Sequence, residues 1–237
     1  MATTTHTLST ADGPMDLYEA TPDGDARAAI VVIQEAFGVN DHIKDVTRRF
    51  AAEGYHAVAP ALFHRAGGGS AGYDDFASIF PLFEGLTDDG ILVDVDAALE
   101  HLRRAGFADS SIGIVGFCFG GRATFLTAAR RAIGAGVGFY GGGIVETSPL
   151  PFPPLIGEAA TLQTPWLGFF GDKDAMIPSE GVEALRSALK AAPVASEIVR
   201  YPDAGHGFHC DARADYHPES AGDAWQRTLA WFGRFLP

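Results

Sequence analysis

The stretch Ser111-Ile112-Gly113-Ile114-Val115-Gly116-Phe117-Cys118-Phe119-Gly120-Gly121 decides how the fold of this chain is read. Its first half is apolar or small, as in a short buried strand, and the residues after Gly120 read as a helix. A Gly-x-nucleophile-x-Gly turn between a strand and a helix is a nucleophile elbow, in which larger side chains would clash. Cys118 stands where such turns normally carry serine, so the sequence predicts covalent catalysis through a thioester.

Composition points to one ordinary globular domain that spans residues 1–237. The net charge of −13 and the lack of a basic stripe argue against a nucleic-acid partner. No basic and apolar leader opens the chain, and no apolar run reaches the roughly 18 residues that a membrane span needs. Two cysteines are too few for a disulfide framework, so we expect a cytoplasmic protein. The oligomeric state is not indicated by the sequence.

Strand-like and helical patterns alternate along the chain. Strand patterns occur at Ala29–Ile33, His56–Ala59, Ser111–Gly116, Gly136–Tyr140, Trp166–Phe170 and Glu197–Tyr201, and the first and third of these are expected to be buried. Helical patterns occur at Asp41–Glu53, Asp88–Arg104, Gly181–Lys190 and Ala224–Phe235. This alternation predicts an α/β fold with a mostly parallel sheet and helices on both faces. The polar segment up to Thr21 is expected to add a small antiparallel edge.

Two segments fall outside this alternation: the glycine-rich loop 65–72, and the Gly- and Pro-rich excursion 141–164, which contains Pro149. Neither has the strand-loop-helix context of a phosphate-binding motif, so no nucleotide cofactor is expected. We expect both segments to line a cleft above the sheet.

His206 is the best-placed base for a cysteine nucleophile, since it lies in a glycine-flanked turn directly after the last predicted strand. Its position after a nucleophile and an acid follows the chain order of α/β-hydrolases. His209 and His217 are weaker competitors. Four other histidines have plainer structural interpretations: His42 and His101 on helices, His56 at the start of a strand, and His6 in the tail.

Two aspartates, Asp172 and Asp174, compete for the role of the acid at the end of the penultimate strand. We favour Asp174, because the apolar residues that follow it suggest a loop packed back beneath the carboxylate. Asp172 would instead cap the turn by accepting hydrogen bonds from backbone N–H groups.

Glu35 follows the first buried strand, in the loop that supplies an oxyanion-hole donor in this type of fold. We therefore expect the backbone N–H groups of Ala36 and Phe119 to hold the developing oxyanion. A carboxylate beside the nucleophile would influence the protonation of the thiol, by charge repulsion or by accepting its proton. The alternative is that Glu35 is a solvated loop residue.

Four segments together resemble the dienelactone hydrolase (carboxymethylenebutenolidase) family. They are Gln34-Glu35-Ala36-Phe37-Gly38, Gly116-Phe117-Cys118-Phe119-Gly120-Gly121, Gly171-Asp172-Lys173-Asp174 and Gly205-His206-Gly207-Phe208. The resemblance implies an α/β-hydrolase domain with a Cys118–His206–Asp174 triad that cleaves a small ester or lactone. It also implies that Glu35 contacts the resting thiol and helps to make the thiolate when substrate binds.

The chain departs from the family pattern at the residues that recognise a substrate carboxylate. The arginine that characterised members carry four residues after the triad histidine is Cys210 here. Arg65 and Arg213 are the remaining candidates for anion recognition, and we expect Phe37 and Tyr140 to contact the substrate as well. No metal is expected, since the histidines and carboxylates show no ligand spacing of the His-Glu-x-x-His kind.

Three alternatives use the same residues in other ways. A thioesterase or an acyltransferase would share the triad and differ in the leaving group or the acceptor. A catalytically silent α/β-hydrolase would only bind a ligand. In the third alternative, Cys118 has no role in acyl transfer and is either a buried structural residue or one half of a redox pair with Cys210.

Overall fold

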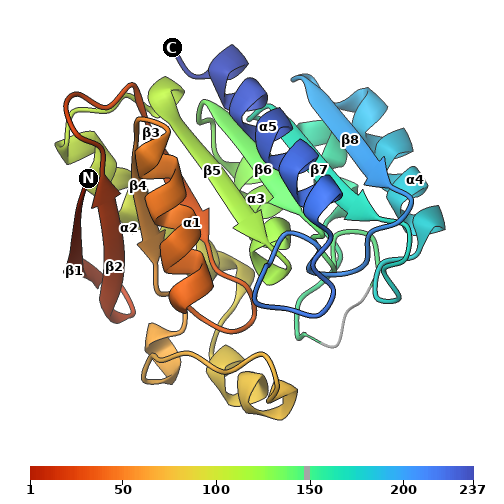
Figure 1. Cartoon of the computed structure of the whole chain (residues 1–237), viewed down its shortest axis with the longest axis horizontal. Coiled ribbons are helices and arrows are strands. Elements are labelled where there is room, and N and C mark those ends of the chain that lie inside the picture. The colour runs from red at the N-terminus through yellow and green to blue at the C-terminus, as the bar shows by residue number, and fades with distance from the viewer. Residues whose placement is uncertain (147–149) are drawn as a thin grey trace.

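A computed structural model describes residues 1–146 and 150–237, apart from the side chain of Phe76, so Pro149 lies outside the described residues. Its centre is one eight-stranded sheet with the order β1-β2-β4-β3-β5-β6-β7-β8 (Figure 1). The strands are β1 Ala2–Thr10, β2 Gly13–Thr21, β3 Ala28–Ile33, β4 Tyr55–Pro60, β5 Ile112–Phe117, β6 Ala135–Phe139, β7 Trp166–Gly171 and β8 Ser196–Tyr201. Strands β3 to β8 are parallel, and β1 and β2 form an antiparallel hairpin at one edge.

Helices cover both faces of the sheet, as the sequence predicts. They are α1 Asp41–Ala52, α2 Asp88–Arg104, α3 Phe119–Arg130, α4 Ser179–Ala188 and α5 Pro218–Phe235. Helices α1 and α5 lie on one face, and α2, α3 and α4 lie on the other (Figure 1). Short 3-10 turns occupy the connections, including His64–Ala66 and Phe76–Phe83 after β4.

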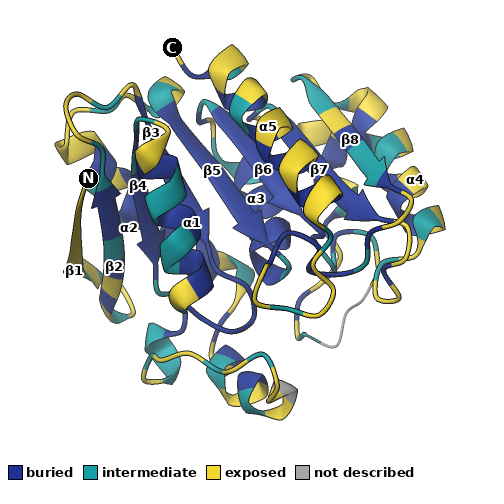
Figure 2. Ribbon diagram, in the orientation of Figure 1, coloured by how far each residue is buried: buried dark blue, intermediate teal, exposed yellow. Residues whose placement is uncertain are grey.

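The parallel strands β3 to β7 are buried on both faces, whereas the edge strand β8 is partly exposed (Figure 2). In β3, Val31 and Ile33 belong to the core under α2, α3 and α4, while Ile30 and Val32 belong to the core under α1 and α5. Side chains alternate across a strand, so a continuous apolar run is what a strand between two helical layers requires. The apolar runs of the sequence therefore correspond to the central strands of the sheet.

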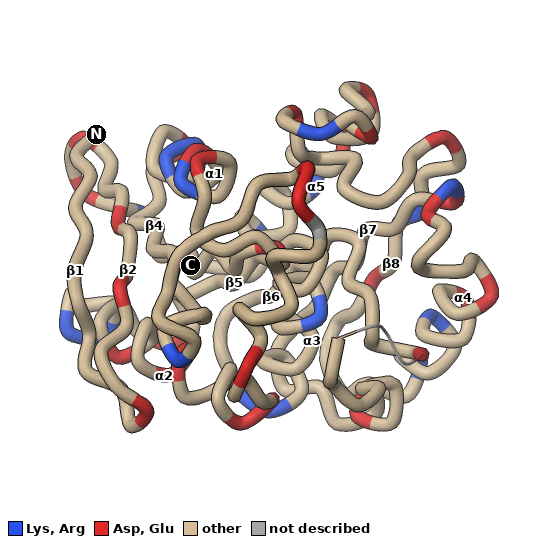
Figure 3. Tube along the Cα trace, turned by 90° about the horizontal axis from the view of Figure 1, so that it is seen from below, with Lys and Arg blue, Asp and Glu red and all other residues tan. Residues whose placement is uncertain are grey.

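Helix α5 begins at Pro218, six residues before the predicted start at Ala224. His217 caps this helix, because its Nδ1 accepts the Ser220 N–H, and proline is favoured in the first helical turn. The predicted pattern missed this first turn because it is polar and small rather than periodically apolar. Among the described residues, no helix is long and apolar enough to cross a membrane. Lys and Arg lie at scattered positions along the trace rather than in one stripe (Figure 3).

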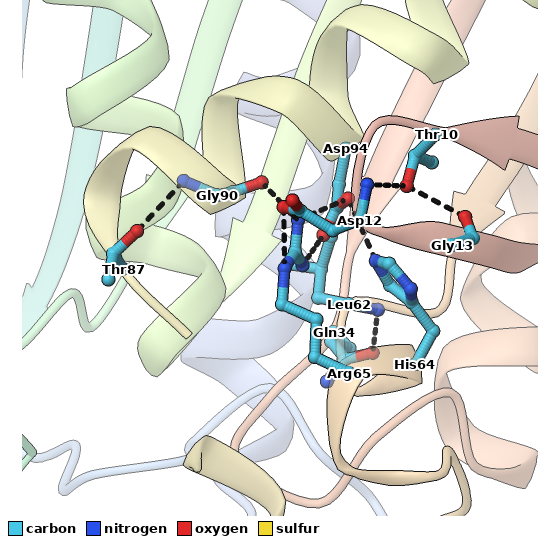
Figure 4. A network of polar contacts seen from close by, with 10 residues as sticks. All are labelled: Thr10, Asp12, Gly13, Gln34, Leu62, His64, Arg65, Thr87, Gly90 and Asp94. Carbon is cyan, nitrogen blue, oxygen red and sulfur yellow. Dashed lines mark hydrogen bonds and ion pairs between the residues drawn. The ribbon is translucent and has the colours of Figure 1, made fainter. Parts of the chain in front are cut away.

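Arg65 lies in a polar network between the β1–β2 turn and α2, and it does not line the cavity at Cys118 (Figure 4). Its guanidinium donates to Asp94 at 2.6 Å and 3.0 Å, and to Asp12 at 2.9 Å. Asp94 is fully buried and is also paired with His64 at 3.0 Å. A buried carboxylate needs such partners, so Arg65 is engaged in neutralising Asp94 rather than free to bind a substrate.

Candidate active site

Cys118 occupies the turn between β5 and α3 with a strained backbone, at φ 54° and ψ −115°. The turn is tight because backbone approaches backbone at its two glycines. A Cβ at Gly116 would lie 2.2 Å from the Gly120 carbonyl oxygen, and a Cβ at Gly120 would lie 2.5 Å from the Gln34 carbonyl oxygen. A side chain at either glycine would push the helix away from the strand, so the elbow requires both.

Three side chains from the carboxyl ends of three strands meet above the sheet. Cys118 follows β5, Asp174 follows β7 and His206 follows β8. The His206 Nε2 lies 3.1 Å from the Cys118 Sγ, and its Nδ1 lies 2.7 Å from the Asp174 Oδ2. The other Asp174 oxygen accepts the Met176 N–H at 2.8 Å, which fixes the carboxylate on its turn. The geometry is that of a nucleophile, a base and an orienting acid.

The two competing aspartates have different partners. Asp174 is buried behind His206, whereas Asp172 points to the outer edge of the sheet, where it accepts the Arg200 Nε–H at 2.7 Å. The Asp172 backbone N–H continues the β7–β8 pairing through the Tyr201 carbonyl. Of the two, the structure brings only Asp174 to the imidazole.

His206 has a strongly perturbed proton affinity. Burial alone would lower its pKa, because a buried imidazolium loses hydration. Interactions with Cys118 and Asp174 outweigh burial and raise the pKa from 6.5 to about 10. The protonated ring therefore contributes stability that is complete below pH 6.5 and is lost as the pH rises through about 10.

The two competing histidines, His209 and His217, pack in the core or cap a helix and do not contact the Cys118 sulfur. His209 is buried, and its ring stacks on Phe117 at 5.0 Å and on Trp225 at 6.1 Å between centroids. Burial, aided by Arg49, lowers the pKa of His209 well below its usual value, so the ring is neutral. His217 caps α5. Of the three histidines considered in this region, His206 is the one in contact with the sulfur.

Glu35 is fully buried in the loop after β3. Its Oε2 accepts the Tyr73 hydroxyl at 2.7 Å, and its Oε1 lies 3.7 Å from an Arg213 guanidinium nitrogen. Within the described part of the chain, Oε1 has no hydrogen-bond donor, and His206 is the hydrogen-bond partner of the Cys118 Sγ. The solvated interpretation of Glu35 is therefore wrong, and the carboxylate is held by Tyr73 and Arg213.

Tyr73 is a site residue that sequence analysis missed. It comes from the loop after β4, beyond the glycine-rich loop, and it also contacts the Cys210 thiol. Burial first, and the Glu35 carboxylate next, raise the pKa of Tyr73 well above its usual value and that of Cys210 to about 11. Both groups are thus neutral. Cys118 and Cys210 are free thiols in this structure.

Tyr140 packs beneath the triad and is completely buried. Its ring lies 5.2 Å from the His206 ring, and its backbone is strained at φ 38°. Its hydroxyl has no hydrogen-bond partner within the described residues. Tyr140 is not among the residues that line the cavity at Cys118, so the structure places it as a support for the imidazole rather than at the substrate.

A cavity of about 60 Å³ opens at the sulfur. Most of the predicted site residues line it, together with apolar side chains: Ala36, Phe37, Ile79, Cys118, Phe119, Gly142, Leu150, Met176, His206 and Arg213. Phe119 is the first residue of α3, where a backbone N–H has no acceptor within its own helix. The cavity therefore holds the thiol, the base, the expected oxyanion donors and one arginine.

A second cavity of about 170 Å³ adjoins the first and shares Gly142 and Met176 with it. It lies between the loop after β6 and the start of α4, and its lining includes Ile144, Phe170 and Val182. Its lining is predominantly apolar, so the space beside the triad suits an uncharged group.

The sequence of this chain is similar to those of known proteins over most of its length. The sequence matches the dienelactone hydrolase family over residues 15–236. A candidate carboxymethylenebutenolidase of Salmonella typhimurium is 43% identical over 229 residues, covering 93% of this chain and 83% of that protein. A candidate carboxymethylenebutenolidase of Escherichia coli K12 is 42% identical over 230 residues, with the same coverage.

Solved structures resemble this chain in fold, and one of them also resembles it in sequence. The crystal structure of a candidate dienelactone hydrolase from Klebsiella pneumoniae superposes with a TM-score of 0.89 at 40% identity, covering 99% of this chain and 100% of that one. An acylaminoacyl peptidase of Pyrococcus horikoshii shares the fold alone, with a TM-score of 0.77 at 16% identity over 99% of this chain and 41% of that one. The chain therefore belongs to the dienelactone hydrolase family and is a hydrolase with the α/β-hydrolase fold.

Proposed function

We propose that this hydrolase cleaves a small ester or lactone by acyl transfer through the Cys118 thiol. The observation that carries the proposal is the continuous set of contacts from the sulfur through His206 to Asp174, at the wall of a small cavity. A thiol, an imidazole and a carboxylate in this order are the parts that acyl transfer to sulfur needs.

In the acylation half, His206 already carries its proton, so the thiol proton passes to the Glu35 carboxylate and the thiolate attacks the substrate carbonyl carbon. The tetrahedral intermediate then expels the alkoxide, which takes the proton from His206 and leaves as an alcohol. In a lactone, the new hydroxyl stays attached to the acyl group. Asp174 accepts the Nδ1–H throughout, which keeps Nε2 directed at the sulfur.

In the deacylation half, His206 takes a proton from water, and the resulting hydroxide attacks the thioester carbonyl. Collapse of the second intermediate releases a carboxylic acid and the Cys118 thiolate. The thiolate takes its proton back from Glu35 and His206 keeps the proton from water, which restores the starting state. The wall of apolar side chains around the sulfur limits access to groups that fit the cavity.

The oxyanion of both intermediates would be held by the backbone N–H groups of Ala36, in the loop after β3, and Phe119, at the start of α3, which both line the cavity. The Phe119 donor also lies at the positive end of the α3 helix dipole. Fixed donors of this kind stabilise developing charge without reorganisation, and removal of one usually costs about a hundredfold or more in rate.

Glu35 would act on the charge of the thiol rather than on the substrate. Its Oε1 has no hydrogen-bond donor within the described residues, so a small movement of the Arg213 side chain changes the field that the carboxylate exerts on the site. A substrate anion that draws Arg213 away from Glu35 would leave the carboxylate free to accept a proton. Substrate binding would thereby promote thiolate formation.

Arg213 is the guanidinium that reaches the cavity, and it lies 5.9 Å from the Phe37 ring and 5.7 Å from the Tyr73 ring. We propose that it receives a carboxylate or another small anion on the substrate. Cys210 is neutral where the family carries a second arginine, so this chain would bind an anion with one guanidinium. The adjoining apolar cavity would take the uncharged end of the substrate.

We predict that Cys118→Ala lowers kcat/KM for p-nitrophenyl acetate by at least roughly a thousandfold, because it removes the sulfur that would carry the acyl group. The matched control is Cys210→Ala, which removes the second free thiol and should keep kcat/KM within about threefold of the wild type. Steady-state kinetics with both purified variants would test the prediction. If Cys118→Ala kept a tenth of the wild-type kcat/KM, the proposal would be wrong.

We predict an alkaline limit to kcat/KM near pH 10, where His206 loses the proton that it donates to the leaving group. Because Asp174 helps to raise this pKa, Asp174→Asn should move the limit toward neutral pH by on the order of one unit. Asp172→Asn is the control and should leave the limit in place. Stopped-flow measurements of kcat/KM against pH, corrected for spontaneous hydrolysis of the ester, give the alkaline limit of each protein. An unchanged limit in Asp174→Asn would show that the carboxylate does not act on His206.

We predict that Arg213→Met lowers the ratio of kcat/KM for a carboxylated aryl ester to that for its neutral analogue by about tenfold, since one charge-assisted contact is lost. Arg65→Met should leave this ratio unchanged, although it should lower the free energy of unfolding by about 3 kcal/mol by leaving Asp94 buried without its guanidinium. The ratio of the two kcat/KM values does not depend on how much of the enzyme is folded, so a loss of stability does not affect this comparison. Loss of selectivity in Arg65→Met instead would reverse the roles of the two arginines.

A further inference from the structure

Three histidines converge on one glutamate at the edge of the sheet, far along the strands from the catalytic cavity. His6 comes from β1, Glu19 from β2, His56 from β4 and His101 from the last turns of α2. His56 is in register with Ala29 at the start of β3, whereas Cys118 follows the opposite, carboxyl end of β5. This cluster is therefore separate from the triad.

The ring nitrogens surround both oxygens of the carboxylate. The His6 Nε2 contacts the Glu19 Oε2, the His56 Nε2 contacts Oε1, and the His101 Nε2 lies 3.6 Å from Oε1. The ligand-capable atoms of His6, Glu19 and His101 all lie within 4.8 Å of one another. The His6 and His101 rings lie side by side, tilted by 48°, with centroids 5.0 Å apart.

Charge balance alone does not account for this arrangement. Glu19 is 9% exposed, so its carboxylate is held away from solvent among the three imidazoles. A single carboxylate is neutralised by one cation, yet three imidazoles from three separate segments direct Nε2 toward it. Imidazole nitrogen with carboxylate oxygen is a ligand set typical of zinc and other first-row divalent metals.

We propose that His6, Glu19 and His101 form a binding site for a divalent transition-metal ion such as Zn²⁺, with His56 holding the carboxylate in place. Tetrahedral ligands at zinc distances lie roughly 3.3 Å apart. The 3.6 Å separation of the His101 Nε2 and the Glu19 Oε1 is close to this value, whereas the His6 Nε2 contacts the Glu19 Oε2 directly and would move away from it to admit the ion. His56 contacts the Glu19 Oε1 and would hold the carboxylate in the orientation that the ion needs. The His6 side chain is 38% exposed, which gives the ion a path from solvent and a water as fourth ligand.

A metal here would link three segments that otherwise meet only along the sheet edge. Strand β1 pairs with β2 alone, and most of its residues are exposed. The ion would tie β1 and β2 to the carboxyl end of α2. Because a ligand that binds only the folded state stabilises it, the hairpin and the whole domain should gain thermal stability from zinc.

The test uses the Cys118→Ala protein, because a thiol beside an imidazole would bind zinc at the triad as well. After treatment with a chelator and desalting, the protein is mixed with a small excess of ZnCl₂ and desalted again. Elemental analysis then gives the metal content, and thermal melting gives Tm with and without zinc. We expect one zinc ion per chain and a rise in Tm of several degrees.

Ligand variants decide between a built site and non-specific binding. In the same background, His6→Gln and His101→Gln should retain less than a tenth of the metal and lose the Tm rise. His217→Gln, which changes a histidine outside the cluster, should retain both. His6→Gln changes an exposed edge strand, so circular dichroism is expected to show it folded.

Two results would overturn the proposal. One is a metal content in the parent protein no higher than that in His6→Gln and His101→Gln. The other is an equal loss of zinc in the His217→Gln control. In either case the histidines would only pair with Glu19 as ions.

Discussion

The close backbone contact between Gly116 and Gly120 is the constraint on which the active site depends. It brings the first turn of α3 onto the end of β5, and the residue between them must then adopt φ 54°. That strained conformation places the Cys118 sulfur at the cavity wall, next to the first free N–H group of the helix. The imidazole and the carboxylate need only follow neighbouring strands, because the carboxyl ends of parallel strands share one edge of the sheet.

A second constraint is the buried charge of Glu35. A carboxylate without solvent exposure needs compensation, and here it receives a tyrosine hydroxyl and a guanidinium at 3.7 Å. The neighbouring Tyr73 and Cys210 remain neutral, so Arg213 is the cation that balances the anion among the residues the structure describes. This balance makes the site sensitive to any ligand that competes for Arg213. Substrate recognition and thiol activation would then depend on the same side chain.

The parts of the site that follow from local sequence were predictable, and those that follow from tertiary contacts were not. The elbow, the strand runs and the turns around Asp174 and His206 each have a local pattern, because glycine and apolar spacing set them. Asp94 lies on the predicted α2 helix, but nothing local shows that Arg65 neutralises it from 29 residues away. Tyr73 likewise gives no signal until the loop folds over Glu35.

The histidine cluster shows the same limit. His6, His56 and His101 have unremarkable local contexts, and the spacing rules for metal motifs detect ligands that lie close together in sequence. Here two antiparallel strand pairings and the end of a helix bring the side chains to one carboxylate. Only the sheet order β1-β2-β4, with α2 packed beside it, places them within reach of one another.

The central claim is that Cys118 carries the acyl group during turnover, and rapid-quench mass spectrometry of the intact protein tests it most directly. During the first turnovers with an activated aryl ester, the account predicts one acyl group per chain, located by peptide mapping on the segment that contains Cys118. The adduct should disappear when the thioester is treated with hydroxylamine. A full burst of the alcohol product without any adduct, or an adduct on another residue, would contradict the account.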